Sequence, residues 1–217
     1  MTVKAVLFDL DGTLTNTLED IANAMNRALR LNDLPEFSVN EYRYLVGDGV
    51  KKLAERACRG RRDKEAAVLR DYQAYYGTHT RDRTAPYDGV PEMLADLLRR
   101  GMKLAVFSNK PHADTCAVVD YFFPGVDFAA VRGQIEGTPV KPDPAGALAI
   151  AEAMGLAPEQ FAYLGDTATD MACAVNAGMM PVGALWGFRT AEELLESGAR
   201  VLIEHPSQLA GLLGLTE

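Results

Sequence analysis

Two aspartates that flank a single leucine, in Asp9-Leu10-Asp11, are the first residues of this chain whose types and spacing suit chemistry. They follow the apolar residues Val3 and 5–8, a run that is too short for a helix and typical of a buried strand. In open α/β sheets, ligands bind outside the carboxyl ends of the strands, so the pair is a candidate catalytic or metal-binding site. An ordinary acidic turn after a strand fits these residues alone equally well.

Side chains suited to binding phosphate or a cation also occur in three later segments. They are Ser108 and Asn109 after the predicted strand 103–107, Lys141 in a loop bounded by proline, and Asp166 and Asp170 after the predicted strand 161–164. The hydroxyl of Ser108 and the backbone amides beside it can hold phosphate oxygens. These segments together favour phosphoryl transfer.

Four aspartates gathered at one edge of a sheet would repel one another, since like charges about 4 Å apart cost roughly 4 kcal/mol at an effective dielectric constant near 20. The four are Asp9, Asp11, Asp166 and Asp170. A divalent cation removes this repulsion. Oxygen ligands without a nearby histidine or cysteine favour Mg²⁺, and Lys141 supplies one further positive charge for a phosphate.

In order and approximate spacing, these segments resemble the haloacid dehalogenase-like hydrolases, which are mostly phosphatases. The resemblance covers nearly the whole chain and is carried by Asp9-Leu10-Asp11-Gly12-Thr13-Leu14, Ser108, Lys141-Pro142, and Gly165-Asp166 with Asp170. It implies that Asp9 is the nucleophile that forms an aspartyl-phosphate. It also implies that Asp11 protonates the leaving oxygen and then activates the hydrolytic water.

The same resemblance implies the remaining site roles. Ser108 and Lys141 would hold the transferring phosphoryl group. Asp9, Asp166 and the main-chain carbonyl of Asp11 would bind Mg²⁺, with Asp170 supporting the metal site. Gly12, Thr13 and Asn109 are further candidates for substrate binding.

Differences between this chain and family members with other activities disfavour some of the possible reactions. Dehalogenase members lack an acid at the position of Asp11, so cleavage of a carbon–halogen bond is disfavoured. Phosphosugar mutase members carry a histidine shortly after the Gly-Thr turn, and residues 16–20 contain none. A phosphatase acting on a sugar phosphate or pyrophosphate, a mutase and a non-catalytic phosphate sensor remain as alternatives.

Within the family, the chain is most similar to phosphoglycolate phosphatases, which implies 2-phosphoglycolate as the substrate. The similar segments are Ser108-Asn109-Lys110-Pro111, Gly47-Asp48-Gly49 and Trp186-Gly187-Phe188. Gly47, Asp48 and Gly49 are therefore candidates for substrate binding, although such a loop also suits a simple helix junction. Trp186 and Phe188 suit core packing as well as a binding loop. Relatives often have Asp-Ser where this chain has Asn16-Thr17.

The predicted elements would position these residues on an α/β fold. Residues 16–82 read as helices without a convincing strand, with Thr17 as a helix cap and with Tyr75 and Tyr76 packing against helices, their hydroxyls at the surface. From residue 90 onward, strands and helices alternate, which predicts a Rossmann-like parallel sheet with helices on both faces. We expect a catalytic core of residues 1–15 and 83–217 and an inserted helical cap of residues 16–82. The linkers 15–17 and 78–86 are candidate hinges.

Composition excludes several classes of partner. A formal net charge of −8 and a pI near 5.0 disfavour nucleic acid, which is held by clustered lysine and arginine. The three cysteines are widely spaced and predict neither a zinc site nor disulfides. No apolar stretch approaches the roughly 20 residues of a membrane span. We expect a cytoplasmic monomer or homodimer that acts on a small phosphorylated metabolite.

Overall fold

A six-stranded parallel sheet forms the centre of the computed structural model, which describes residues 2–215. The strand order is β5-β4-β1-β6-β7-β8. The strands are β1 (Ala5–Phe8), β4 (Lys103–Pro111), β5 (Phe128–Gln134), β6 (Phe161–Gly165), β7 (Met180–Ala184) and β8 (Val201–Ile203). In the central register, Phe8 pairs with Val106 and Leu164, so the carboxyl ends of β1, β4 and β6 meet at one edge of the sheet.

Helices cover both faces of this sheet, as the alternation of elements predicts. They are α4 (Val90–Arg99), α5 (His112–Phe122), α6 (Ala145–Ala153), α7 (Ala168–Ala177), α8 (Ala191–Glu196) and α9 (Gln208–Leu212). Alternation along β1 divides the core, because successive side chains of a strand point to opposite faces. Phe8 packs in one apolar cluster with Leu94 of α4, whereas Leu7 packs in another with Ile150 of α6. The predicted α/β class is confirmed.

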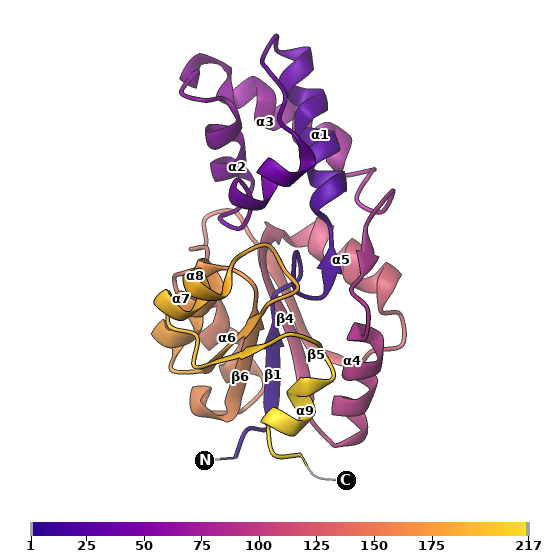
Figure 1. The fold of residues 1–217 in the computed structure, drawn as a ribbon, viewed down its shortest axis with the longest axis vertical. Helices are drawn as coiled ribbons and strands as arrows, with labels where there is room; N and C mark the ends of the chain where they lie inside the picture. The colour runs from indigo at the N-terminus through magenta and orange to yellow at the C-terminus, as the bar shows by residue number, and fades with distance from the viewer. Residues whose placement is uncertain (1, 216–217) are drawn as a thin grey trace.

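The helices of residues 18–76 form a separate layer above one end of the sheet (Figure 1). They are α1 (Leu18–Leu31), the 3₁₀ helix η1 (Val39–Tyr44), α2 (Val50–Ala57) and α3 (Arg62–Tyr76). Their buried faces form an apolar cluster of their own, which includes Met25, Tyr42 and Tyr72. We call this layer the cap, and we keep residues 16–82 as its proposed extent.

Two short strands, β2 (Thr15–Asn16) and β3 (Ala85–Pro86), connect the cap to the core as an antiparallel pair. Both lie within the linkers that the sequence identifies as hinges, although neither strand is predicted. Asp20, in the first turn of α1, also contacts the second linker. Its buried carboxylate accepts hydrogen bonds from the backbone amides of Arg83 and Thr84 at 2.9–3.0 Å. The candidate hinge is therefore a paired and hydrogen-bonded connection.

The structure corrects several predicted details. Strand β4 continues to Pro111, so Ser108 and Asn109 lie on the strand itself and not in a loop after it. Thr17 precedes α1, but its hydroxyl is buried without a hydrogen-bond partner and does not cap the helix.

Among residues 2–215, no helix combines the length and apolar character that crossing a membrane requires.

Candidate active site

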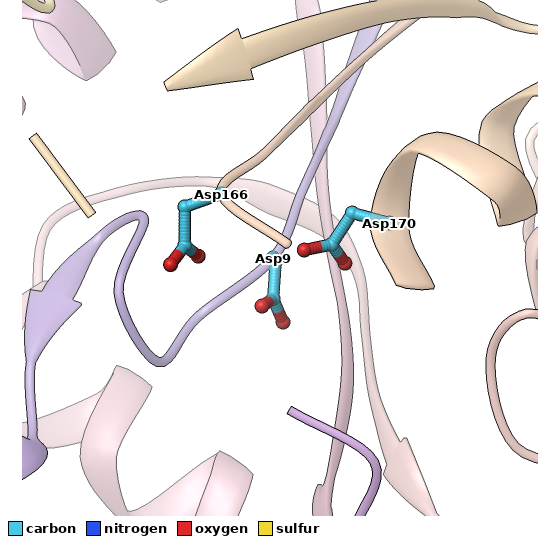
Figure 2. A group of neighbouring side chains, drawn as sticks. All are labelled: Asp9, Asp166 and Asp170. Carbon is cyan, nitrogen blue, oxygen red and sulfur yellow. The ribbon is translucent and has the colours of Figure 1, made fainter. Parts of the chain in front are cut away.

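Three buried aspartates converge where β1 and β6 end and α7 begins (Figure 2). Asp9 directly follows β1, Asp166 follows β6, and Asp170 lies in the first turn of α7. One carboxylate oxygen of each lies within 4.8 Å of the others. The parallel sheet explains this convergence, because it brings the carboxyl ends of adjacent strands to the same edge.

Lys141 lies among these acids and is 2% exposed. Its Nζ is 2.8 Å from Oδ1 of Asp9 and 2.6 Å from Oδ1 of Asp170, and it donates to the carbonyl of Phe107 at 3.1 Å. The Asp9 contact is an ion pair without hydrogen-bond alignment, which leaves Oδ1 of Asp9 without a hydrogen-bond donor. Burial would lower the pKa of Lys141, but the charges of Asp170 and Asp9 outweigh this effect and raise it.

Asp166 is held by groups from two other segments. Thr13 donates its hydroxyl to Oδ1 at 2.8 Å, and the backbone amide of Phe188 donates to Oδ2 at 2.8 Å. Gly12 and Gly187 pack directly against this carboxylate, where a Cβ atom at either position would collide with Asp166. Gly12 also has a φ of +95°, a conformation that favours glycine. The Gly-Thr turn and the aromatic loop therefore fix the orientation of Asp166.

Asp170 has its oxygens occupied by protein donors. Oδ2 accepts the hydroxyl of Thr167 at 2.6 Å and its backbone amide at 3.0 Å, in a capping box that begins α7. Oδ1 accepts from Lys141 at 2.6 Å. This arrangement suits a residue that positions the lysine and supports the site.

The electrostatics of the acids fit a cation. Burial, the charge of Asp170 and, to a lesser extent, that of Asp11 raise the pKa of Asp9 to about 7, against the opposing effect of Lys141. Burial and the charges of Asp170 and Asp9 likewise raise the pKa of Asp166 well above its usual range. A divalent cation among these oxygens would offset the repulsion that raises both pKa values. The donor set is all oxygen, which fits Mg²⁺.

Asp11 lies apart from the three converging aspartates and pairs with a second lysine. Nζ of Lys110 is 2.9 and 3.0 Å from the two carboxylate oxygens of Asp11. The same ammonium donates to the hydroxyl of Tyr76, on α3 of the cap, at 2.6 Å. Asp11 therefore faces the boundary between core and cap.

A cleft of about 500 Å³, including open solvent, separates the cap from the carboxyl edge of the sheet. Its core side includes Asp9, Asp11, Ser108 and Asn109, and its cap side includes Gly47 and Gly49 together with apolar side chains. Asn109 bridges the two sides, donating to the carbonyls of Gly47 at 3.0 Å and of Lys141 at 3.2 Å. A reacting group bound here would contact both candidate aspartates at once.

Comparison with known proteins identifies the family of this chain. The sequence pattern of the family described as haloacid dehalogenase-like hydrolase matches residues 6–184, a span that holds all the acids above. The chain belongs to this family. The resemblance expected from the sequence is thus confirmed, and with it the expectation of a hydrolytic enzyme of the phosphatase type.

Relatives of this hydrolase include phosphoglycolate phosphatases. That of Pseudomonas putida is 32% identical, over 85% of this chain and 70% of the relative. That of Rhodospirillum rubrum is 30% identical, over 99% of this chain and 92% of the relative. A Lactobacillus delbrueckii protein, provisionally named phosphoglycolate phosphatase, has a crystal structure that superposes with a TM-score of 0.93 at 27% identity, over 98% of this chain and 99% of that chain.

The hydrolase's predicted site residues do not all meet in one place. Asp9, Asp11, Ser108, Asn109, Gly47 and Gly49 line the cleft, and Lys141 lies directly behind Asp9. Gly12 and Thr13 instead pack against or bond to Asp166. Asp48 accepts from Thr169 of the core at 2.7 Å and pairs with Arg56 of the cap, so it connects the two layers.

Sequence reasoning missed the side chains of Lys110 and Tyr76 at this hydrolase site. Tyr76 was expected to place its hydroxyl at the surface, but the residue is 1% exposed and its hydroxyl contacts Lys110. The expectation was wrong because the helical period shows that a tyrosine faces inward without showing which element it meets. Lys110 lies one residue from Asn109 in the quoted motif, and this adjacency was the available signal.

Proposed function

We propose that this hydrolase is a Mg²⁺-dependent phosphatase that hydrolyses 2-phosphoglycolate through an aspartyl-phosphate on Asp9. The observation that carries the proposal is that Asp9, which contacts Lys141, and Asp11 both line the core side of the same cleft. A nucleophile and a proton donor must reach opposite ends of one phosphorus–oxygen bond, and this arrangement provides both.

In the first half-reaction, a carboxylate oxygen of Asp9 attacks phosphorus while the bond from phosphorus to the leaving oxygen breaks. Asp11 donates its proton to that oxygen, so the leaving group departs as a neutral hydroxyl. In the second half-reaction, Asp11 takes a proton from water as the water attacks phosphorus. The bond from phosphorus to Asp9 breaks, which releases inorganic phosphate and restores both acids.

The surrounding residues orient the phosphoryl group. Lys141 is fixed by Asp170 and by the carbonyl of Phe107, so its charge stays beside Asp9 without reorganisation during the reaction. Ser108 is 2% exposed and lines the cleft near Asp9, where its hydroxyl would donate to a phosphoryl oxygen. We assign both residues to holding the transferring group.

Asp9, Asp166 and the main-chain carbonyl of Asp11 are the proposed holders of Mg²⁺. When bound, the ion would neutralise charge on the phosphoryl oxygens and on the acids. Thr13 and Phe188 keep Asp166 oriented toward this position, and Asp170 supports it through Lys141.

The names of the relatives support 2-phosphoglycolate as the substrate. A sugar phosphate or pyrophosphate is the second candidate substrate. The missing histidine after the Gly-Thr turn keeps a mutase less favoured.

Asp9→Asn tests the proposal. We expect the release of phosphate from 2-phosphoglycolate in the presence of Mg²⁺ to fall by at least about 10³-fold, because an amide is a poor nucleophile. Asp127→Asn is a matched control, since Asp127 is exposed and lies outside the cleft. Free phosphate produced without an acceptor separates hydrolysis from mutase chemistry. Full activity of Asp9→Asn would overturn the mechanism.

A further inference from the structure

Lys110 is a buried cation that the proposed chemistry leaves without a role. It is 5% exposed and holds both oxygens of Asp11, and its ammonium lies 4.7 Å from the ring centroid of Tyr76. Among the described residues that line the cleft, it is the one cation. Lys141, by contrast, lies behind Asp9 and already contacts two carboxylates. Any further anion on a bound substrate would therefore meet Lys110.

The rest of the cap wall offers few partners for a polar leaving group. Ile21, Val46, Val50 and Leu53 line it with apolar side chains. A sugar would bring several hydroxyls against these apolar side chains, and each buried hydroxyl that lacks a hydrogen bond there costs free energy. A short leaving group that carries one anion matches the one cation of the cleft.

We propose that Lys110 and Tyr76 form the site that binds the carboxylate of the leaving group and so select phosphate esters of short hydroxy acids. This inference rests on the proposed phosphatase function and names the feature of the substrate that is recognised. Nζ of Lys110 would pair with the carboxylate. The hydroxyl of Tyr76 accepts from Lys110, so its own proton is free to be donated to the same carboxylate. Burial raises the pKa of Tyr76, which keeps this hydroxyl a donor.

The position of Lys110 fits the chemistry of such esters. Asp11 must reach the leaving oxygen, and Lys110 lies 2.9–3.0 Å from the carboxylate oxygens of Asp11. In 2-phosphoglycolate, a single carbon separates the ester oxygen from the carboxyl group, so the carboxylate lies beside the oxygen that Asp11 protonates. When Asp11 turns toward that oxygen, Lys110 would lose its counter-ion, and a buried unpaired charge is costly. The substrate carboxylate replaces it.

Two esters that differ only at the recognised group test this site. They are 2-phosphoglycolate and 2-hydroxyethyl phosphate, in which a CH₂OH group replaces the carboxylate. We expect the wild type to prefer 2-phosphoglycolate in kcat/KM. In Lys110→Met, the ratio of the two kcat/KM values should fall about 10- to 100-fold, the range for a lost hydrogen bond to a charged group. If the substitution displaces Asp11, kcat/KM falls by the same factor for both substrates, and the ratio does not change.

Further variants keep the outcome decisive. Lys110→Arg should retain most of the preference, and Tyr76→Phe should lose part of it. If Lys110→Met turns over neither ester, calorimetry gives the dissociation constants of both esters for this variant and for Asp9→Asn, which keeps Lys110. The ratio of the two constants is then compared between the variants. An unchanged ratio in Lys110→Met, or a wild type that hydrolyses both esters equally well, would overturn the carboxylate site while the phosphatase stands. A wild type inactive on every phosphate ester would instead refute the proposed function.

Discussion

At the residue scale, the acids of the site are placed where their charges are unfavourable to the folded chain. Asp9 is 6% exposed, and burial first, then the charge of Asp170, raises its pKa to about 7. The usual value is 3.8. The native state therefore holds this proton between about pH 4 and pH 7, where the unfolded chain has released it. The resulting destabilisation is absent below that window and grows as the pH rises through it.

Asp9→Asn should accordingly stabilise the metal-free protein. Because one pKa unit corresponds to about 1.4 kcal/mol, the free energy of unfolding should increase by up to about 4 kcal/mol at pH 8 and by less than half of that at pH 5. Urea denaturation with a chelator at both pH values measures the difference, and Asp127→Asn again serves as the control. Mg²⁺ should stabilise the wild type more at pH 8 than at pH 5, since binding requires ionised carboxylates. A variant that is less stable than the wild type at pH 8 would contradict this account.

Sequence alone located the residues whose surroundings are local. Asp9 and Asp11 follow a short apolar run, and the capping box of Asp170 lies within one turn, so their positions could be predicted from neighbours in the chain. Tyr76 and Lys110 are 34 residues apart and meet only after the cap docks on the sheet. No periodic pattern encodes that contact, because helical spacing fixes the face of a helix but not its partner.

At the element scale, the candidate hinge joins the cap to the core through few residues. Strands β2 and β3 each have two residues, too few to show an alternating pattern in the sequence. Asp20 reinforces the connection from the first turn of α1, with its carboxylate 2.7 Å from the hydroxyl of Thr84 and 2.9 Å from the Thr84 amide. The linkers could be located from the loss of helical pattern. Their pairing could not, because it joins segments far apart in the sequence, as the contact of Asp20 with Thr84 does.

Asp20→Ala should therefore destabilise the protein by about 2–4 kcal/mol, because two backbone amides and a hydroxyl lose a buried charged acceptor. Urea denaturation gives the magnitude. Limited proteolysis should show faster cleavage within residues 78–86. Glu19→Ala is the matched control, as Glu19 lies in the same turn with a side chain that is 54% exposed, and it should change stability by no more than about 0.5 kcal/mol. Equal effects of the two substitutions would refute the role of Asp20.

At the scale of the whole molecule, two arginines connect the cap to the core. One lies in the cap and one in the core, and each donates hydrogen bonds to main-chain carbonyls of the other layer. Arg43 of the cap donates to the carbonyls of Gly187 at 2.6 Å and Phe188 at 3.2 Å. Arg189 of the core donates to the carbonyls of Arg43 and Val46 in return. The alternation of elements predicted the sheet and the insertion. This docking could not be predicted, because the acceptors are main-chain carbonyls, which every residue possesses.

Arg43→Ala should shift the molecule toward an open cap. Two charge-assisted hydrogen bonds are lost from the docked arrangement of the cap described above and not from an open one, so we expect kcat/KM for the phosphate ester to fall about 10-fold. The radius of gyration measured by small-angle scattering should increase at the same time. Arg62→Ala removes an exposed arginine of the same cap and should leave both quantities unchanged. If Arg43→Ala lowers kcat/KM without changing the scattering, Arg43 acts through the loop that holds Asp166, since Phe188 donates to that carboxylate, and not through closure of the cap.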